Sequence, residues 1–448
     1  MLRRKLTEYI EHYYDSTNRA LLLTGARQTG KTYAARQFGK RYKNFIEINF
    51  IEQPAAVNLF KNVAGADEIL LRLSAFVNIP LVPDETLIFF DEVQRCENII
   101  TAIKFLVDDG RFRYILSGSL LGEELKDIRS VPVGYMGVKE VFPLSLEEFL
   151  INVGVGDNVL SLLRYSFENR VEVDNMVNDR MLQLFRLYTI VGGMPAAVES
   201  YLDTKNLNDV MITQRDIVDL YRMDISQYAD RDKLRIKEIF DLIPSELNEK
   251  NKRFILKSLN QNAKFDRLKN DFLWLKDAGV AIPVYNVEEP KEPLKLAVTR
   301  NLFKLFSNDV GLLTAQYADG IQVRILENES DINYGSVYEN AVAQELLAHD
   351  ISPYYYNNKK RGEVDFIISL GGKVVPLEVK SGKDYKRHAA LNNIMNIDEY
   401  DIQEGIVLGN CNVSRINRIT YLPIYMIMFV EKLHLPDLVY DIDLSGLR

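Results

Sequence analysis

One short stretch constrains this chain more than any other, because it fits the pattern G-x-x-x-x-G-K-[ST] in full. The stretch is Gly25-Ala26-Arg27-Gln28-Thr29-Gly30-Lys31-Thr32. The apolar run 20–23 before it has the character of a buried strand, and residues 33–40 after it have that of a helix. Glycines let the backbone wrap closely around phosphate oxygens, and the amides at the start of a helix point at the anion. The stretch therefore predicts a phosphate-binding loop between a strand and a helix.

The lysine and threonine that close this loop have distinct expected roles. Lys31 would reach the β- and γ-phosphates of a nucleotide, and the hydroxyl of Thr32 would be a ligand of Mg²⁺. The Asn-Lys-x-Asp pattern that is typical of guanine recognition does not occur in the sequence. We therefore expect ATP rather than GTP. The alternative is a glycine-rich turn that binds nothing, which the flanking strand and helix disfavour.

A phosphate loop needs an acidic partner on a neighbouring strand. The run 86–90 is apolar on both faces, as in a buried parallel strand, and Asp91 and Glu92 follow it directly. Carboxylates at the carboxyl end of such a strand face the ligand crevice. Asp91 is the expected magnesium-site carboxylate, acting through bound water, and Glu92 is the candidate for orienting the attacking water. The alternative is a solvated acidic pair at a strand end.

A further strand is expected at 114–116, and small polar residues follow it. Ser119 is the residue that we expect to touch the γ-phosphate, in preference to Ser117, although serines are frequent in turns for local reasons alone. Any of four arginines could stabilise the transition state, and the sequence does not separate them. They are Arg95, Arg111, Arg113 and Arg129.

Length and composition limit the class of protein. At 448 residues the chain is too long for one core, so roughly two to four domains are expected. No apolar run approaches the roughly 18 residues of a membrane span, and no apolar segment follows the basic start 1–5. The two cysteines lie far apart and have no metal-ligand spacing. We expect a cytoplasmic protein without a membrane partner.

The order of predicted elements divides the chain into four regions. Alternating strands and helices over 1–150 predict a parallel α/β sheet, in which 45–50 is the second strand and 138–141 the last. Residues 151–220 have a helical pattern, broken at Gly192-Gly193-Met194-Pro195, and would form a lid over the nucleotide. Helices at 253–259 and 265–278, with strands at 280–285 and 294–298, make 221–327 winged-helix-like. The last region is 333–448.

The charge distribution bears on a nucleic-acid partner. The net charge of −8 argues against nucleic-acid binding by the chain as a whole. The segment 233–276, however, contains 11 Lys and Arg against 6 Asp and Glu. DNA binding by this segment is one interpretation. A solvated helical face or a contact with a protein is the other.

The last region contains a second set of candidate site residues. We expect a helix from 335 to 349, strands at 354–356, 364–368 and 374–380, a helix at 389–395, and strands at 405–408 and 425–429. Because residues i and i+2 of a strand share a face, Glu378 and Lys380 project together. If Asp365 lies beside them, its carboxylate and that of Glu378 could hold Mg²⁺, with Glu339 as a third acid and Lys380 orienting the attacking water. Each acid also has a local structural explanation, such as the capping box that Ser336 and Glu339 would form.

With these motifs in view, the chain resembles the prokaryotic AAA-type ATPases that carry a C-terminal domain of uncharacterised function related to the PD-(D/E)xK nucleases. The resemblance covers nearly the whole chain. It rests on 22–32, 88–95, 116–119, 192–195, 243–245, 252–254, 309–312, Glu339, 362–365 and 377–381. It implies ATP binding, hydrolysis, a winged-helix element and a restriction-endonuclease-like C-terminal fold. Many relatives have Gly-Arg ahead of the Pro-Leu-Ser segment, whereas Gly134-Tyr135 stands here, which puts an arginine finger at that place in doubt.

Three functions fit these features. The leading hypothesis is an ATPase whose nucleotide state regulates a Mg²⁺-dependent, nuclease-like domain that interacts with DNA. The second is an ATP-dependent switch that does not cut, and the third is a signalling ATPase with protein partners. A protein partner or a homo-oligomer is compatible with each of them.

Overall fold

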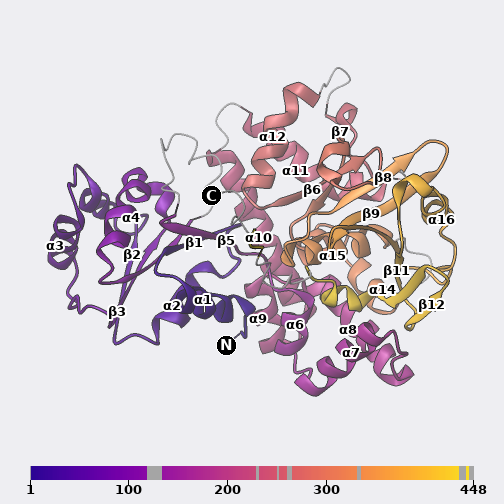
Figure 1. The fold of residues 1–448 in the computed structure, drawn as a ribbon, viewed down its shortest axis with the longest axis horizontal. Helices are drawn as coiled ribbons and strands as arrows, with labels where there is room; N and C mark the ends of the chain where they lie inside the picture. Colours follow the sequence, from indigo (N-terminus) through magenta and orange to yellow (C-terminus); the bar gives the residue numbers. More distant parts are fainter. Residues whose placement is uncertain are drawn as a thin grey trace.

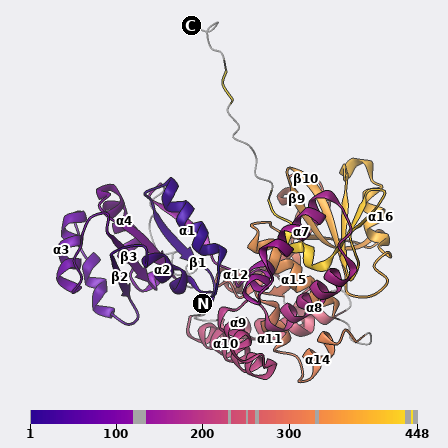
Figure 2. The same cartoon turned by 90° about the horizontal axis from the view of Figure 1, so that it is seen from below.

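The computed structural model describes residues 2–118, 134–228, 232–249, 252–259, 265–329, 334–432 and 440–442. Two lobes are evident in Figure 1, an N-terminal lobe drawn in indigo and violet and a larger lobe drawn from magenta to yellow. Helices α9 (Pro195–Thr204) and α10 (Leu207–Tyr228) lie near the junction of the two lobes in both views (Figures 1 and 2). The phosphate loop lies at the same junction.

The N-terminal lobe is built on a five-stranded, fully parallel sheet. Its order is β2-β3-β4-β1-β5. The strands are β1 (Ala20–Thr24), β2 (Asn44–Asn49), β3 (Thr86–Asp91), β4 (Arg113–Ser117) and β5 (Met136–Glu140). This confirms the predicted parallel α/β sheet, with each expected strand within two residues of its predicted bounds.

Both faces of this sheet are covered by helices, which explains why its inner strands β1, β3 and β4 are buried and mainly apolar. Leu87 and Phe89 pack with α1 (Lys5–Ser16) and α2 (Lys31–Gly39) on one face. Ile88 and Phe90 pack with α3 (Ala66–Phe76), α4 (Glu97–Asp109) and the 3₁₀ helix η1 (Pro54–Phe60) on the other. The lobe therefore has three layers, with the carboxyl ends of its strands free to form a site.

A run of helices follows the N-terminal sheet. These are α6 (Leu146–Asn152), α7 (Asp157–Asn169), α8 (Asn175–Val191), α9, α10, α11 (Lys233–Asn248) and α12 (Phe265–Asp277). The predicted break at 192–195 is present between α8 and α9. Gly192 has a φ of 70°, and Pro195 is the first residue of α9. Among the described residues no single helix has the length and apolarity to cross a membrane; only α8 and α9 taken together pass that test, and they are bent by 119°.

The larger lobe contains a mixed eight-stranded sheet of order β12-β13-β11-β10-β9-β8-β6-β7. Its strands are β6 (Ala281–Val287), β7 (Val298–Ser307), β8 (Tyr354–Asn358), β9 (Gly362–Leu370), β10 (Lys373–Lys380), β11 (Gly405–Gly409), β12 (Ser414–Ile416) and β13 (Ile419–Pro423). The long, almost fully buried helix α15 (Gly335–Ala348) packs on one face, and α16 (Ala389–Met395) packs on the other. The short helices α13 (Val310–Thr314) and α14 (Ile321–Leu326) precede α15.

Three predicted elements differ from the structure. The expected helix at 253–259 is only a 3₁₀ turn, Leu256–Ser258, and the main helix of this region is α11, which tolerates Pro244 in its interior. The expected strand at 294–298 is a 3₁₀ turn followed by the longer strand β7. Residues 425–429 are not a strand but lie in the 3₁₀ helix Ile424–Phe429, because the preceding strand β13 ends at Pro423. An apolar run fixes burial more firmly than it fixes the type of element.

The β6–β7 hairpin belongs to the large sheet. Strand β6 pairs with β8 in parallel, with Tyr285 opposite Tyr354, and α11 and α12 pack against the hairpin. The order of two helices and a hairpin, which suggested a winged helix, is therefore present. The sheet nevertheless crosses the boundary that we predicted between 327 and 333, and one hydrophobic cluster runs from the helices into the strands of the C-terminal region.

Candidate nucleotide-binding site

The loop 25–32 connects β1 to α2, as predicted. Gly25 has a φ of 122°, and a Cβ there would lie 2.4 Å from the carbonyl oxygen of Val141. Gly30 has a φ of 94° and caps α2. Both positions therefore need glycine, for backbone conformation and, at Gly25, also for space. The first turn of α2 begins at Lys31, so its free amides face the concave side of the loop.

Lys31 is buried and folded back over its own loop. Its Nζ donates to the carbonyl oxygens of Gly25, at 3.0 Å, and Ala26, at 2.6 Å. Burial lowers the pKa of Lys31 to about 8, an effect that Glu92 and Asp91 oppose only in part. The ammonium therefore has dipolar partners and no direct carboxylate partner, so a phosphate group would be a better ligand than those it holds here.

Asp91 lies at the carboxyl end of β3 with neutral donors around it. Its Oδ2 accepts from Thr32 Oγ1 at 3.0 Å and from Asn49 Nδ2 at 3.3 Å, while Ser117 Oγ donates to its Oδ1. Hydroxyl and carboxylate oxygens are ligands that Mg²⁺ prefers. The residues that the sequence assigned to the metal, Thr32 and Asp91, are thus in direct contact and fit that ion.

Of the serines that the structure describes, Ser117 reaches this site. Ser119, the residue that we selected, lies outside the described residues. Ser117 is the last residue of β4, between β1 and β3 in the sheet. The rule that side chains at carboxyl ends of parallel strands line the crevice would have favoured Ser117, had the strand been expected to extend one residue further.

Glu92 follows Asp91 in a left-handed backbone conformation, with a φ of 57°. This conformation costs a non-glycine residue about 1 kcal/mol and turns the chain sharply at the end of β3. Glu92 Oε2 accepts from Gln94 Nε2 at 2.5 Å. Glu92 lines the same pocket as Lys31 and Thr32. Glu92 therefore lies beside the loop and is held by a neutral amide, and its role in orienting water stays a prediction.

The pocket beside the loop has a volume of about 490 Å³ and is shared by the two lobes. The N-terminal lobe contributes loop residues, Tyr33 and Glu92. Helices α9 and α10 contribute Pro195, Glu199 and Leu220. Helices α9 and α10 thus line the pocket beside the loop, and the lid that we expected at 151–220 stays a prediction.

The loop itself is held by the larger lobe. Arg27 Nη1 forms an ion pair with Asp224 Oδ1 of α10 at 2.7 Å, and Tyr221 Oη donates to the carbonyl of Arg27 at 3.1 Å. Gly279, just after α12, approaches so closely that a Cβ there would lie 2.8 Å from the amide nitrogen of Ala26. A change in the conformation of the loop would therefore alter its contacts with α10 and with the residue that follows α12.

The four candidate arginines separate in the structure. Arg113 begins β4, at the end of the sheet away from the loop, and Arg111 lies two residues before it and pairs with Asp109 and Asp67. Arg129 lies outside the described residues. Arg95 is in the 3₁₀ turn Val93–Arg95, beside Glu92. Of the described candidates, Arg95 alone lies at the carboxyl end of the parallel strands, where the loop also lies.

The predicted C-terminal acids do converge, but on lysines. Glu339 of α15 is fully buried and pairs with Lys252, and its Oε2 lies 3.2 Å from Lys304 Nζ. Lys304 Nζ, itself fully buried, also lies 2.8 Å from Glu363 Oε1 and 3.8 Å from Asp365 Oδ1. No sequence pattern indicated a role for Lys304, because a lysine on an alternating edge strand looks solvated.

Glu378 and Lys380 share a face, as expected, and form an ion pair of 2.6 Å. Asp365 Oδ2 accepts from the amide of Val379 at 2.9 Å, so the neighbouring strands do bring Asp365 beside them. Burial, and then the charge of Asp365, raises the pKa of Glu378 to about 8. Burial, and then the charge of Glu339, raises the pKa of Asp365 to about 6.

These residues fit a divalent metal poorly as they stand. Burial alone would lower the pKa of Lys304, but Glu339, Glu363 and Asp365 together raise it well above its usual range. Glu339, Glu363 and Asp365 thus already share a buried cation. Within the described ranges, no group of three or more His, Cys, Asp or Glu side chains could hold a metal ion. Metal ligation by Glu339, Asp365 and Glu378, and water activation by Lys380, stay predictions.

Comparison with known families finds matches to three separate parts of the chain. Residues 17–150 match a family described as an AAA domain. Residues 182–322 and 334–427 match two families, each described as a domain of unknown function (DUF8612 and DUF4143). A comparison with curated proteins gave no match. The part of the N-terminal lobe from 17 to 150 is therefore similar to AAA domains.

Similar solved structures are distant. The Walker-type ATPase PABY2304 of Pyrococcus abyssi is 15% identical, with a TM-score of 0.40, over 70% of this chain and 95% of its own. RuvB of Thermotoga maritima is 14% identical, with a TM-score of 0.29, over 65% and 91%. The Aeropyrum pernix ORC1 protein, solved in complex with DNA, is 13% identical, with a TM-score of 0.26, over 68% and 88%. These likenesses are too remote to carry an argument about function.

Proposed function

We propose that this chain is a Mg²⁺-dependent ATPase that works as a switch, in which the nucleotide state of the loop 25–32 controls DNA binding by the larger lobe. The single observation that carries the proposal is the direct contact of the larger lobe with the loop, through Asp224 and Tyr221 of α10 and through Gly279. A nucleotide that reorders the loop must strain or relax these contacts. The two lobe arrangements would then differ in nucleotide affinity, which is the requirement for a ligand-driven switch.

The hydrolytic site needs few residues. Thr32 and Asp91 would hold Mg²⁺, and the ion when bound supplies positive charge for the phosphate oxygens. Lys31 would exchange the carbonyls of Gly25 and Ala26 for phosphate. Glu92 would accept a hydrogen bond from the attacking water and orient it.

DNA is the effector that the charge distribution favours. Lys233 on α11 and Arg267, Lys269 and Lys276 on α12 are exposed. Exposed cations on two helices that contact each other attract phosphate backbones without regard to sequence. Glu339, Glu363 and Asp365 are already paired with Lys304. This pairing favours a protein that binds DNA without cutting it.

Fluorescence anisotropy with a labelled duplex, with and without ATP and Mg²⁺, tests the proposal. We expect binding that weakens steeply with salt and changes with ATP, and no nicking of plasmid under the same conditions. Nicking that is lost in both Asp365→Ala and Lys380→Ala would favour the nuclease instead. No retention of DNA at low salt would contradict a DNA effector and point to protein partners.

A further inference from the structure

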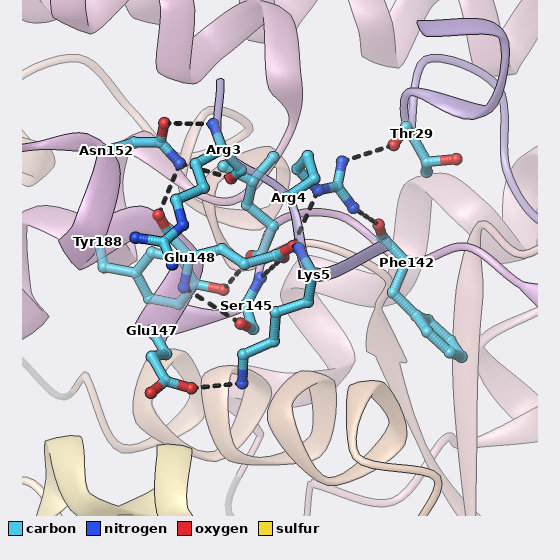
Figure 3. Close-up of polar contacts among 11 residues, drawn as sticks. Arg3, Arg4, Lys5, Thr29, Phe142, Ser145, Glu147, Glu148, Asn152 and Tyr188 are labelled. Carbon is cyan, nitrogen blue, oxygen red and sulfur yellow. Dashed lines mark hydrogen bonds and ion pairs between the residues drawn. The ribbon is translucent and has the colours of Figure 1, made fainter. Parts of the chain in front are cut away.

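Arg4 is buried beside the phosphate loop although it lies outside every motif of the sequence. It precedes α1, and its side chain fans out toward three acceptors, as Figure 3 shows. Nη1 donates to the carbonyl of Thr29 at 2.9 Å, Nη2 to the carbonyl of Phe142 at 2.9 Å, and Nε to Glu148 Oε1 at 3.1 Å. Arg4 also lines the pocket shared by the lobes.

The contact with Thr29 has a consequence for the other end of the same peptide unit. In a planar trans peptide, the carbonyl and the following N–H point in opposite directions. A guanidinium that holds the Thr29 carbonyl therefore fixes the direction of the Gly30 N–H, away from Arg4. Gly30 caps α2 and, lacking a side chain, has little to fix its peptide otherwise. A positive charge on the carbonyl also polarises that N–H, which makes it a better donor to an anion.

We infer that Arg4 is a positioning residue for nucleotide binding, which orients the Thr29–Gly30 peptide so that the Gly30 N–H donates to phosphate. The inference rests on the proposed function, because it presumes that the loop binds a nucleotide. It adds a residue from outside the loop and outside the parallel sheet. It also explains why a cation is buried here without reaching the pocket as a free charge.

Glu148 fixes Arg4 in turn and connects it to the second lobe. Its Oε1 also accepts from the amide of Lys5 at 2.7 Å, and its Oε2 accepts from the amide of Ser145 at 2.9 Å in the capping box of α6. The next amide, that of Leu146, donates to Glu345 Oε1 of α15 at 2.7 Å. The orientation of one loop peptide is thus tied through Arg4 and the first turn of α6 to the central helix of the larger lobe.

A similar contact supports this interpretation. Tyr221 donates to the carbonyl of Arg27, so it fixes the direction of the Gln28 N–H by the same argument. Two carbonyls of the loop are therefore held from outside. Of these two donors, Arg4 is the one that is charged and bound to a carboxylate. Its loss should therefore raise the Kd for ATP more than the loss of Tyr221.

The competing explanation is that Arg4 only stabilises the fold. The two explanations differ in what happens to nucleotide affinity in protein that is still folded. A purely structural residue lowers the melting temperature and leaves the Kd for ATP unchanged well below that temperature. A positioning residue also raises the Kd and the KM. It leaves kcat nearly unchanged, because the oriented N–H serves the ground state and the transition state alike.

The test uses the full chain with Arg4→Lys and Arg4→Met, and the matched control Arg3→Lys. Arg3 is a neighbouring arginine whose exposed side chain lies 3.8 Å from Glu8 and 3.6 Å from Asp157. Calorimetry with ATP and Mg²⁺ at 20 °C gives the Kd, and circular dichroism at the same temperature checks the fold. For Arg4→Lys we expect a Kd about tenfold higher, the size of one charge-assisted hydrogen bond. For Arg3→Lys we expect no change.

Each outcome decides the matter. An unchanged Kd in folded Arg4→Lys overturns the inference, even if the melting temperature falls. If Arg4→Met does not fold, Glu148→Gln, which keeps an oxygen acceptor but removes the charge that holds Arg4, must raise the Kd by a few-fold. If it does not, the inference is wrong. Absence of ATP binding by the parent chain overturns the proposed function and this inference together, whereas binding by the parent with equal binding by Arg4→Lys overturns the inference alone.

Discussion

A buried lysine lies in each of the two predicted sites, Lys31 in the N-terminal nucleotide site and Lys304 in the C-terminal acidic site. The neighbours of the first are neutral carbonyls, and those of the second are carboxylates. Lys31 lies among backbone carbonyls, and burial lowers its pKa to about 8. Lys304 lies among Glu339, Glu363 and Asp365, which raise its pKa although it is buried even more completely than Lys31. A lysine without a carboxylate partner is available to an anionic ligand, whereas a lysine that neutralises acids belongs to the structure. The same distinction separates Asp91, held by neutral donors, from the C-terminal acids.

The largest effect that would test this difference is expected from Lys304→Met. Removing the ammonium leaves Glu339 and its neighbours buried with too little positive charge, which typically costs about 3–5 kcal/mol. Urea unfolding at pH 7 measures the loss, with Arg300→Met, at an exposed position of the same strand, as the control. A variant as stable as the parent would show that these acids are not ionised around Lys304. The proposed difference between Lys304 and Lys31 would then be wrong.

Glu92→Gln should separate binding from hydrolysis in the N-terminal site. The amide keeps the shape of the side chain but is a far weaker acceptor for the proton of a water molecule, so we expect kcat to fall about 10³-fold. The Kd for ATP should stay within a few-fold of the parent. A coupled assay of phosphate release at saturating ATP measures the rate. Turnover equal to that of the parent would assign the water-orienting role to another residue.

Lys31→Ala is expected to weaken ATP binding about 100-fold, because one side chain supplies charge-assisted hydrogen bonds to two phosphates. Lys380→Ala, at the other site, should leave ATP binding unchanged. Calorimetry on both variants checks the prediction. Normal affinity in the Lys31 variant would mean that the loop does not bind phosphate, and the contrast between the two lysines would lose its functional meaning.

The sequence predicted the N-terminal site well and the C-terminal site only in part, for a physical reason. A phosphate loop is made of neighbours in the chain, and Asp91 follows a strand whose burial is plain from its composition, so Thr32 and Asp91 could be paired without coordinates. The C-terminal acids were correctly placed on a helix and two strands. Lys252 and Lys304, which neutralise them, come from other elements, and no local pattern distinguishes a buried lysine from a solvated one.

The β6–β7 hairpin shows the same limit at the level of the fold. Its strand character is visible in 280–285, but its pairing with Tyr354 of β8 joins elements about seventy residues apart. Arg4 is a further case, since nothing near residue 4 indicates that it will lie against Thr29. Sites made of residues close in the sequence could be predicted from it, whereas contacts across the junction of the lobes could not.

The lowered pKa of Lys31 predicts opposite responses of ATP affinity and of stability to pH. Because the folded, nucleotide-free protein releases the Lys31 proton near pH 8, ATP affinity should fall above that pH by up to ~10-fold per unit, the limit for one linked proton. The stability of the free protein moves the other way. Unfolded Lys31 holds its proton to about 10.5, so between pH 8 and 10.5 the unfolded state binds more protons and stability rises with pH. Lys31→Met should remove this part of both trends, and calorimetry from pH 7 to 9.5 measures the first.

The smallest effect is expected from Lys380→Ala. Lys380 pairs with Glu378, but its side chain is 27% exposed, and burial raises the pKa of Glu378 to about 8. At pH 7 the loss of the ammonium therefore leaves Glu378 mostly protonated rather than as a buried charge, and we expect a cost of about 1 kcal/mol or less. Urea unfolding beside Lys304→Met gives a direct comparison. A loss as large as that of the Lys304 variant would show that Glu378 is ionised at neutral pH, and its carboxylate would then be as dependent on a cation as Glu339.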